Sequence, residues 1–482
     1  MTGVQLVCTQ TTRAITIGNS RNVTLLGPVT VDYDPLPFTQ GRIVSMSEDR
    51  GVHDIELDQG YLSTEFVGPR KYEIFRPDTR TLRFGSYHNV AVNITANQPR
   101  RFQVIKANPN QYQGEQVGDI IAIDAQYAPD GRIPHAVMIQ DSSNITLQDV
   151  TLYASNSFGF FEDNCHGNRY THCRVNRRSW EDDPVPRGAP RIRSLNADAF
   201  HSKHATLGPN YTLCEAQFMA DDGVAVNGDY HMIMSMTDDG TVLRVLAKPN
   251  RFNIQPGDSL ELLDYNGRRI VPNAVAVTAS SQPIDTIRDD EREFVQQQRL
   301  NQDLKNGMTD IYQVTIDRSL DENLPRGSLV GAANRMGNGV IVTGCKIGNN
   351  RSRGILIKAS QATIKDNVLD GVWMESIKVA SEYSWLEAGS SSDVLIDGNV
   401  MRNGNGDGIA VYAYTGRGDN EEIAPAGAHH NVVVQNNVIQ DSVEGRHIWV
   451  TSTDGVVLSN NTYGAGKIML EECENVEQLI RR

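Results

Sequence analysis

The strongest constraint on this chain is a short sequence phrase that recurs along most of its length. Each copy has an alternating apolar strand, a polar turn that often holds Asn, and a second short apolar strand. Clear copies lie at 21–34, 143–161, 209–226, 338–360 and 430–442. Where nothing intervenes the period is short, since Asn367 follows Cys345 by 22 residues and Asn461 follows Asn437 by 24. One such unit cannot bury its own apolar face, so the copies must stack.

The stacked units are predicted to be strands. Their apolar runs are short and rich in Val, Ile and Thr, and only 288–306 has a charged, helix-like pattern. Stacked coils would place neighbouring strands about 4.8 Å apart. We therefore predict an all-β protein, a right-handed parallel β-helix. A β-propeller is the alternative, although each of its blades needs about 40–45 residues.

Two long stretches interrupt the repeat and resemble each other. In 42–132 the segment 43–51 parallels the segment 233–240 of 231–337, and each has an apolar strand followed by an acidic-Gly turn. This pattern predicts two related small β-barrel modules inserted into the coils. Long ordered loops on a solenoid usually gather on the binding face.

The interruptions divide the 482 residues into five predicted segments. These are the first β-helix coils (1–41), the first inserted module (42–132), the central coils (133–230), the second inserted module (231–337) and the C-terminal coils (338–482).

Composition excludes several kinds of partner. Lys plus Arg number 45 and Asp plus Glu 59, so the formal charge is −14, which argues against general nucleic-acid binding. No apolar run approaches the roughly 20 residues of a membrane-spanning helix. The six Cys include no CxxC pair, so we expect buried free thiols and neither a disulfide framework nor a metal site. The inserted modules could pair two chains into a homodimer, although nothing in the sequence demands one.

The N-terminal sequence leaves the location of the protein open. It has no charged segment followed by an apolar stretch, so no signal peptide is apparent. The repeat already begins there, which predicts that a capping segment precedes residue 1. We expect a secreted or periplasmic protein, with a cytoplasmic location as the alternative.

Three carboxylates fall one repeat apart in the central coils. Asp221 and Asp222 follow Asp198 by 23 and 24 residues, which is one full turn of the repeat. All three should therefore lie on the same edge of the stack, where mutual repulsion pushes their pKa values apart. One group is then kept protonated and another ionised, as a general acid and a general base require. Glycoside hydrolysis needs this pairing, and a separation of roughly 6.5–9.5 Å would give inversion.

The same region carries a family resemblance. Asp198-Ala199-Phe200-His201, followed one turn later by 221–228 (DDGVAVNG), resembles the active-site coils of glycoside hydrolase family 110, β-helical exo-acting α-1,3-galactosidases with inserted barrels. The family pattern is D-G-F-H and then D-D-x-x-N-V-H-G, so the chain departs at Ala199 and at 226–228. Segments 31–41, 350–359 and 384–399 are also similar to that family. The carboxylate layout is similar to that of polygalacturonases too.

The resemblance implies roles for the three acids. Asp221 would be the general acid, and Asp198 with Asp222 would orient and deprotonate the attacking water, although these roles could be permuted. The reaction would be a single inverting displacement on a terminal α-linked galactose, without metal or organic cofactor.

Six further residues are candidates for binding the carbohydrate substrate. His201 and His204 follow Asp198 at intervals of three residues and could bond sugar hydroxyls or modulate the acid. The other four are Asn227 in the second acidic coil, Arg353 on a later coil, and Trp385 with Glu387 in a long polar turn.

Other readings of the sequence stay open. A β-helix polysaccharide lyase would need a Lys or Arg base and usually Ca²⁺, and Lys203 lies near Asp198. A hydrolase acting on another polysaccharide, or a non-catalytic carbohydrate-binding β-helix, also fits. Asp407 repeats the Asp-Gly turn, and we expect it to be structural because no second acid is apparent one coil away.

Overall fold

The computed structural model of the chain describes ten stretches of residues. They are 3–61, 68–86, 92–124, 134–248, 251–282, 287–320, 324–416, 422–440, 445–464 and 466–479. None of the helices in these stretches has the length and apolar character to span a membrane.

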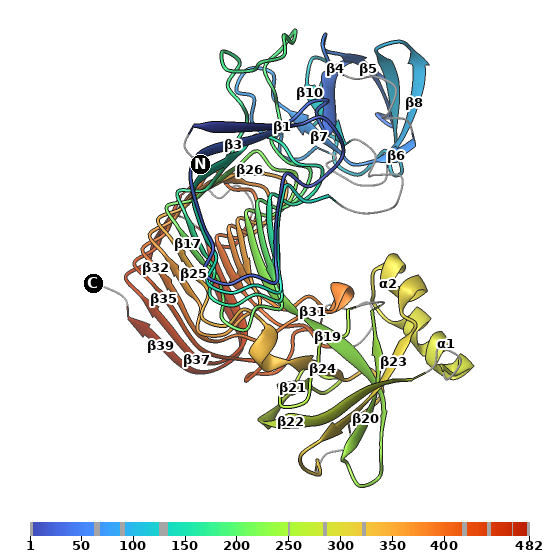
Figure 1. The fold of residues 1–482 in the computed structure, drawn as a ribbon, viewed down its shortest axis with the longest axis vertical. Coiled ribbons are helices and arrows are strands. Elements are labelled where there is room, and N and C mark those ends of the chain that lie inside the picture. The colour runs from blue at the N-terminus through green and yellow to red at the C-terminus, as the bar shows by residue number, and fades with distance from the viewer. Residues whose placement is uncertain are drawn as a thin grey trace.

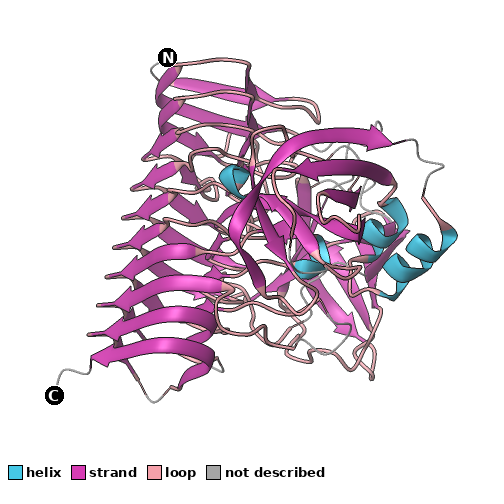
Figure 2. Cartoon of the chain, turned by 90° about the horizontal axis from the view of Figure 1, so that it is seen from below, coloured by secondary structure: helices cyan, strands magenta, loops and turns pink. Residues whose placement is uncertain are grey.

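The chain is the predicted all-β protein built on a parallel β-helix. Strands pair in parallel with the strand one coil away, in three columns along the stack (Figure 2). We call the first column the site sheet, and it contains β2 (Ile15–Gly18), β11 (Val137–Gln140), β13 (Phe160–Asp163), β16 (Phe200–Lys203), β19 (Val224–Met236), β27 (Ile355–Ile357), β30 (Ile377–Val379), β34 (Ile409–Val411), β37 (Ile448–Ser459) and β39 (Ile468–Leu479).

The other two columns complete each coil. One contains β3 (Thr24–Tyr33), β12 (Thr146–Leu152), β14 (Arg169–Thr171), β17 (Asn210–Thr212), β25 (Ile341–Thr343), β28 (Thr363–Lys365), β32 (Ser392–Asp397) and β35 (His429–Gln435). The other begins at β1 (Val4–Cys8), uses the second halves of β3 and β12, and continues through β15 (Arg174–Val175), β18 (Glu215–Gln217), β26 (Lys346–Asn350), β29 (Val368–Val372), β33 (Val400–Arg402), β36 (Val438–Ile439) and β38 (Thr462–Tyr463).

Most antiparallel pairing falls in two regions on one side of the coil stack (Figure 1). In addition, the short strand β31 (Glu387–Ala388) pairs antiparallel with β19 at Gly228 and Asp229. The first region, module 1, contains β4 (Phe38–Met46), β5 (Val52–Leu57), β6 (Gly68–Arg70), β7 (Tyr72–Phe75), β8 (Val92–Gln98), β9 (Arg101–Lys106) and β10 (Ile120–Asp124). Over the described residues its pairings run in the order β6-β8-β9-β5-β4-β10-β7 without closing.

The second region, module 2, closes into a barrel. Its ring runs from β19 through β20 (Val242–Ala247), β23 (Asp310–Ile316), β22 (Arg269–Gln282), β21 (Ser259–Leu263) and β24 (Leu329–Ala332) back to β19. The helix-like segment 288–306 forms α1 (Asp289–Gln297) and α2 (Gln302–Gly307) here. The division of the chain into five segments stays a prediction.

An apolar core and an Asn ladder hold the coils in register. The inward side chains of the site sheet, such as Phe200, are fully buried in a core that runs the length of the stack. At one turn, Asn367 donates through Nδ2 to Asn399 (2.9 Å), Asn399 to Asn437 (3.0 Å) and Asn437 to Asn461 (3.0 Å). Each of these side chains thus links one coil to the next.

The prediction for the cysteines is correct in part. All six are free, and four are buried in the stack. Cys8 and Cys473 are only half-buried, because they lie in β1 and β39 at the two ends of the stack, where no further coil covers them in the described part of the chain.

Candidate active site

The in-register pairing of the site sheet stacks the residues two positions before its strands. We call this line of residues the axial row, and from β11 to β37 it consists of His135, Phe158, Asp198, Asp222, Arg353, Glu375, Asp407 and Arg446. Backbone hydrogen bonds from Gly159 to Asp198 and from Ala199 to Asp222 join neighbouring coils at this row. The spacing of one full turn therefore places the acids on one edge of the stack, as predicted.

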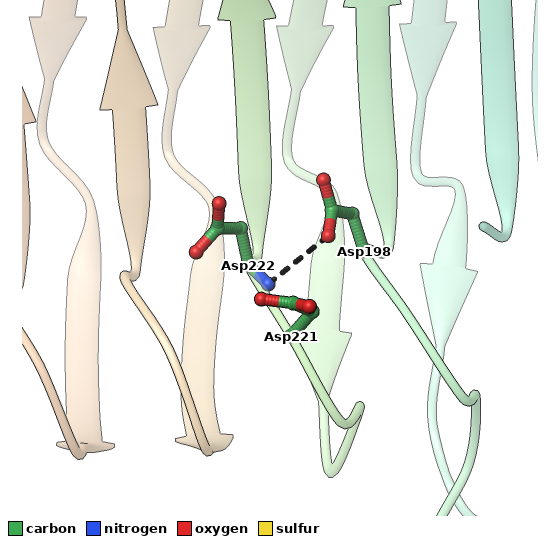
Figure 3. Close-up of side chains that lie close together, drawn as sticks. All are labelled: Asp198, Asp221 and Asp222. Carbon is green, nitrogen blue, oxygen red and sulfur yellow. Dashed lines mark hydrogen bonds between the residues drawn. The ribbon is translucent and has the colours of Figure 1, made fainter. Parts of the chain in front are cut away.

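Three carboxyl groups meet at the centre of the axial row (Figure 3). One oxygen each of Asp198, Asp221 and Asp222 lies within 4.8 Å of the others. The Asp222 backbone N–H donates to Asp198 Oδ1 at 3.3 Å. Oxygens at this spacing could ligate a divalent cation or share a proton, so the neighbouring charges decide their chemistry.

Asp198 is buried beside a neutral imidazole. Its Oδ2 lies 2.7 Å from Nδ1 of His201, whose ring stacks on Phe158 with centroids 4.5 Å apart. Burial, reinforced by the charge of Asp221, raises the pKa of Asp198 well above its usual value. Burial also lowers the pKa of His201 to about 4. Burial therefore favours the protonated form of the Asp198 carboxyl and the neutral form of the His201 imidazole.

Asp222 is held by Arg353 on the next coil. The Arg353 backbone N–H donates to Oδ1 at 2.8 Å, and its guanidinium lies 3.1 Å from Oδ2. Burial raises the pKa of Asp222 to about 7; Arg353 opposes this effect, and the charges of Asp198 and Asp221 add to it. Asp222 thus titrates near neutrality.

Asp221 is the most exposed of the three, with 24% of its side chain accessible. Arg351 donates to its Oδ2 at 2.9 Å, and Lys71 of module 1 approaches the same oxygen at 3.8 Å. Burial alone would raise the pKa of Asp221, but Arg351, Lys71 and Arg353 lower it. The site therefore holds carboxyls with opposite pKa shifts, as the sequence predicted.

His204 lies inside an ion-pair cluster beside the carboxyls. Its Nδ1 is 2.8 Å from Asp163 and its Nε2 is 2.9 Å from Asp229. These two carboxylates raise the pKa of His204 against the effect of burial. Lys203 and Lys248 each lie 3.1 Å from Asp229 Oδ1. Because both ring nitrogens are engaged, His204 positions its neighbours and has no free nitrogen for a sugar hydroxyl.

Glu387 belongs to a second charged cluster. Lys358 lies 2.7 Å from Glu387 and 3.0 Å from Glu382, which also contacts Arg353 at 3.3 Å and Lys378 at 2.8 Å. Lys358 and Lys203 lower the pKa of Glu387 to about 2 against the effect of burial. Glu382 thus links Arg353 of the axial row to the turn that holds Glu387.

The other two candidate binding residues differ in placement. Asn227 is buried and donates to the Gly228 carbonyl at 2.8 Å, while its Oδ1 has no hydrogen-bond partner among the described residues. Trp385 is 47% exposed on a 3₁₀ turn (Tyr383–Trp385), and no side-chain contact within the described ranges joins its indole to the carboxyls. The structure thus brings Asn227 close to the ion-pair clusters and leaves Trp385 at the surface.

Sequence reasoning missed several charged residues of the site. Arg351 and Lys358 lie in the segment 350–359 and could have been found from the family resemblance. Lys71 and Lys248 reach the site from the inserted modules, where no repeat indicates their position.

The fold and the carboxyl cluster together define a class, parallel β-helix proteins with an acidic site between inserted modules. No family model matches the chain. It is 24% identical over 332 residues to α-1,3-galactosidase A of Shewanella woodyi, covering 68% of this chain and 48% of that protein. It is 22% identical over 348 residues to α-1,3-galactosidase B of Bacteroides fragilis, covering 69% and 54%.

The chain is therefore similar to α-1,3-galactosidases, as its motifs indicated, and spans about half the length of the curated relatives it matches. The similarity to polygalacturonases stays a prediction.

Among solved structures, a mannuronan C-5 epimerase A-module of Azotobacter vinelandii matches with a TM-score of 0.34 at 10% identity, covering 74% of this chain and 67% of that one. The catalytic domain of an α-1,3-glucanase matches with a TM-score of 0.27 at 10% identity, covering 92% and 86%.

Proposed function

We propose that this protein is an exo-acting, inverting glycoside hydrolase that removes terminal α-linked galactose from oligo- or polysaccharides. The observation that carries the proposal is the meeting of Asp198, Asp221 and Asp222 with pKa values shifted in opposite directions. Such a set supplies both a proton donor and a proton acceptor. The similarity to α-1,3-galactosidases supports galactose as the sugar.

The ion pairs around the carboxyls support a neutral sugar over a uronate. Each of five cations near the site already has a carboxylate within 3.1 Å, namely Lys203, Lys248, Lys358, Lys378 and Arg353. A uronate would need a cation of its own, whereas a sugar hydroxyl can both accept from a lysine and donate to a carboxylate. The same pairing disfavours Lys203 as a lyase base, because its Nζ is already engaged with Asp229 at 3.1 Å.

Asp221 is assigned as the general acid because it is the most accessible carboxyl, and contact with the leaving oxygen comes before pKa as a requirement. Its cations keep it ionised in the free site. However, carboxyls this close titrate as a coupled set, so a proton taken up by the cluster is shared among the three groups. Asp198 and Asp222 would then orient and deprotonate the water.

The inverting mechanism is proposed from the resemblance to glycoside hydrolase family 110. One oxygen of each acid lies within 4.8 Å of the others, closer than the roughly 6.5–9.5 Å typical of inverting pairs. The first-formed anomer therefore decides the mechanism. Proton NMR during hydrolysis of an α-1,3-linked digalactoside should show β-galactose first, and α-galactose first would establish retention.

The acid role of Asp221 is tested with two leaving groups. Asp221→Asn should lower kcat/KM on the digalactoside by about 10²–10⁴-fold, the usual contribution of a general acid. The loss should be much smaller on a nitrophenyl α-galactoside, whose leaving group needs little protonation. Asp370→Asn, an exposed carboxylate elsewhere on the coils, is the matched control. Equal losses on both substrates would move the acid role to Asp222.

Other outcomes separate the alternatives. Products that absorb in the ultraviolet through a new double bond would indicate a lyase. A folded protein that releases no sugar from a panel of α-galactosides would indicate another sugar or a binding role. The secreted or periplasmic location and the homodimer stay predictions.

A further inference from the structure

The axial row continues past the carboxyls toward the C-terminal coils and reaches an open cavity. Glu375 and Asp407 occupy the row two and three coils after Asp222. At about 4.8 Å per coil, Glu375 is about 10 Å along the stack from Asp222. The cavity has a volume of 290 Å³ and is lined by Met374, Glu375, Asn405, Gly406, Asp407 and Gly445.

This arrangement corrects one expectation from the sequence. Asp407 does have a second acid one coil away, because Ile377 pairs with Ile409 and thereby places Glu375 beside it in the row. The long turn that contains Trp385 and Glu387 lies between the two acids in the sequence and makes this coil longer than the plain repeat.

The opposite end of the row is closed by aromatic rings. His135 and Phe158 stack with centroids 4.9 Å apart, and His201 stacks on Phe158 at 4.5 Å. His135 and His201 are buried, and Phe161 packs against both of them. From the carboxyls the row therefore leads to an open cavity on the Glu375 side and to packed, buried rings on the His135 side.

Glu375 offers the cavity a weakly used acceptor. Its Oε1 receives only a long bond of 3.5 Å from the Tyr412 hydroxyl, and its Oε2 is buried without a hydrogen-bond partner among the described residues. A sugar hydroxyl in the cavity can therefore give this carboxylate a shorter, charge-assisted hydrogen bond than the one it has. Asp407 is already satisfied by Arg446, which donates through its backbone N–H (2.6 Å) and its guanidinium (2.8 Å).

We propose that this cavity is a further sugar subsite, in which Glu375 accepts a hydrogen bond from a hydroxyl of a neutral sugar unit on the leaving-group side of the scissile bond. The subsite deepens the proposed function and rests on it. It implies that the enzyme prefers oligosaccharides long enough to reach from the carboxyls to Glu375, with only the terminal galactose being released.

Hydrolysis of a length series tests the subsite. With α-1,3-linked galactosides from the disaccharide to the pentasaccharide, kcat/KM should rise by about 10-fold at the length that reaches the cavity, the effect of one hydrogen bond to a charged group. Glu375→Gln should abolish this rise and leave disaccharide hydrolysis within about twofold. Asp370→Asn, which removes a carboxylate of the same coil that pairs with Arg402 outside the cavity, should retain the rise. A rate independent of length, or a rise that survives Glu375→Gln, would overturn the subsite.

A binding measurement separates this proposal from the proposed function. By calorimetry, Asp221→Asn protein should bind the pentasaccharide about 10-fold more tightly than the disaccharide, and addition of Glu375→Gln should remove the difference. If the disaccharide is not hydrolysed by the unmodified protein, the proposed function fails, and calorimetry alone then decides the subsite. Equal binding of the two lengths, or no binding, would overturn it.

Discussion

The two inserted modules reach the same site but are attached to the coils in different ways. Module 2 grows out of β19, a single strand that pairs with its coil neighbours over 224–227 and with barrel strands from Tyr230 onward. Module 1 has its own sheet and is joined to the coils mainly by side chains, together with a backbone hydrogen bond from the Gly188 N–H to the Gln59 carbonyl (2.8 Å). Its Glu73 and Asp124 pair with Arg193, a fully buried residue five positions before Asp198. One module is thus fixed by backbone and the other mainly by a buried ion cluster.

The modules also contribute cations to different acids. Lys71 of module 1 lies 3.8 Å from Asp221, whose side chain is a quarter exposed. Lys248, which directly follows β20 in module 2, lies 3.1 Å from the buried Asp229. Module 1 thus places a cation beside the most accessible carboxyl of the site, whereas module 2 places one beside a buried carboxylate.

The largest effect is expected on stability, from a substitution that breaks the ion pairs between module 1 and the coils. Arg193→Ala would leave Glu73 and Asp124 buried without their cation, and breaking a buried pair costs about 3–5 kcal/mol. Chemical denaturation should show this loss, or an early separate transition of module 1. Arg101→Ala is the control, because it removes an exposed ion pair with Glu56 and should cost less than about 1 kcal/mol. Similar costs for the two variants would refute the buried junction.

A smaller effect is expected on the pH dependence of activity when single cations near the carboxyls are removed. Arg351→Gln and Lys71→Met should both raise the pKa of Asp221, since both cations lower it in the native protein, and Arg351 should have the larger effect because it is closer. The pH profile of kcat/KM should therefore shift toward higher pH. Lys248→Met should leave the profile in place, because its carboxylate partner is Asp229. A shift of equal size in all three variants would erase the distinction between the modules.

The charge cluster beside module 2 should give a pH-dependent contribution to stability. The pKa of His204 is raised in the folded protein, so the stabilisation from its two ion pairs is full below the unfolded pKa of about 6.5 and is lost as pH rises through the folded pKa. The difference in unfolding free energy between the native protein and His204→Gln should thus be largest near pH 6 and shrink at high pH. A constant difference would mean that His204 is neutral in the folded state.

Removal of divalent cations should have the smallest effect. Arg351, Lys71 and Arg353 already compensate the carboxyls, so dialysis against a chelator should leave galactose release unchanged. Loss of activity that Ca²⁺ restores would favour the lyase alternative.

The residue spacing of the repeat predicted the parts of the site that lie on consecutive short coils. Asp198 and Asp222 are separated by one plain repeat with nothing inserted between them, so period alone placed them in register. The same arithmetic failed for Glu375 and Asp407, because an extended turn lengthens their coil. It could not predict Lys71 or Lys248 at all, since tertiary packing of the modules brings them to the site.

The Asn ladder has a consequence for how proteins of this kind can change in length. Each rung from Asn367 to Asn461 bonds only to the coils directly above and below it, so a duplicated coil would bring its own rung and meet the same partners on both sides. Gain of a whole coil in the C-terminal region would therefore preserve the ladder, whereas a partial coil would break it. Evolution can lengthen this end of the molecule in steps of one turn while leaving the acidic coils untouched.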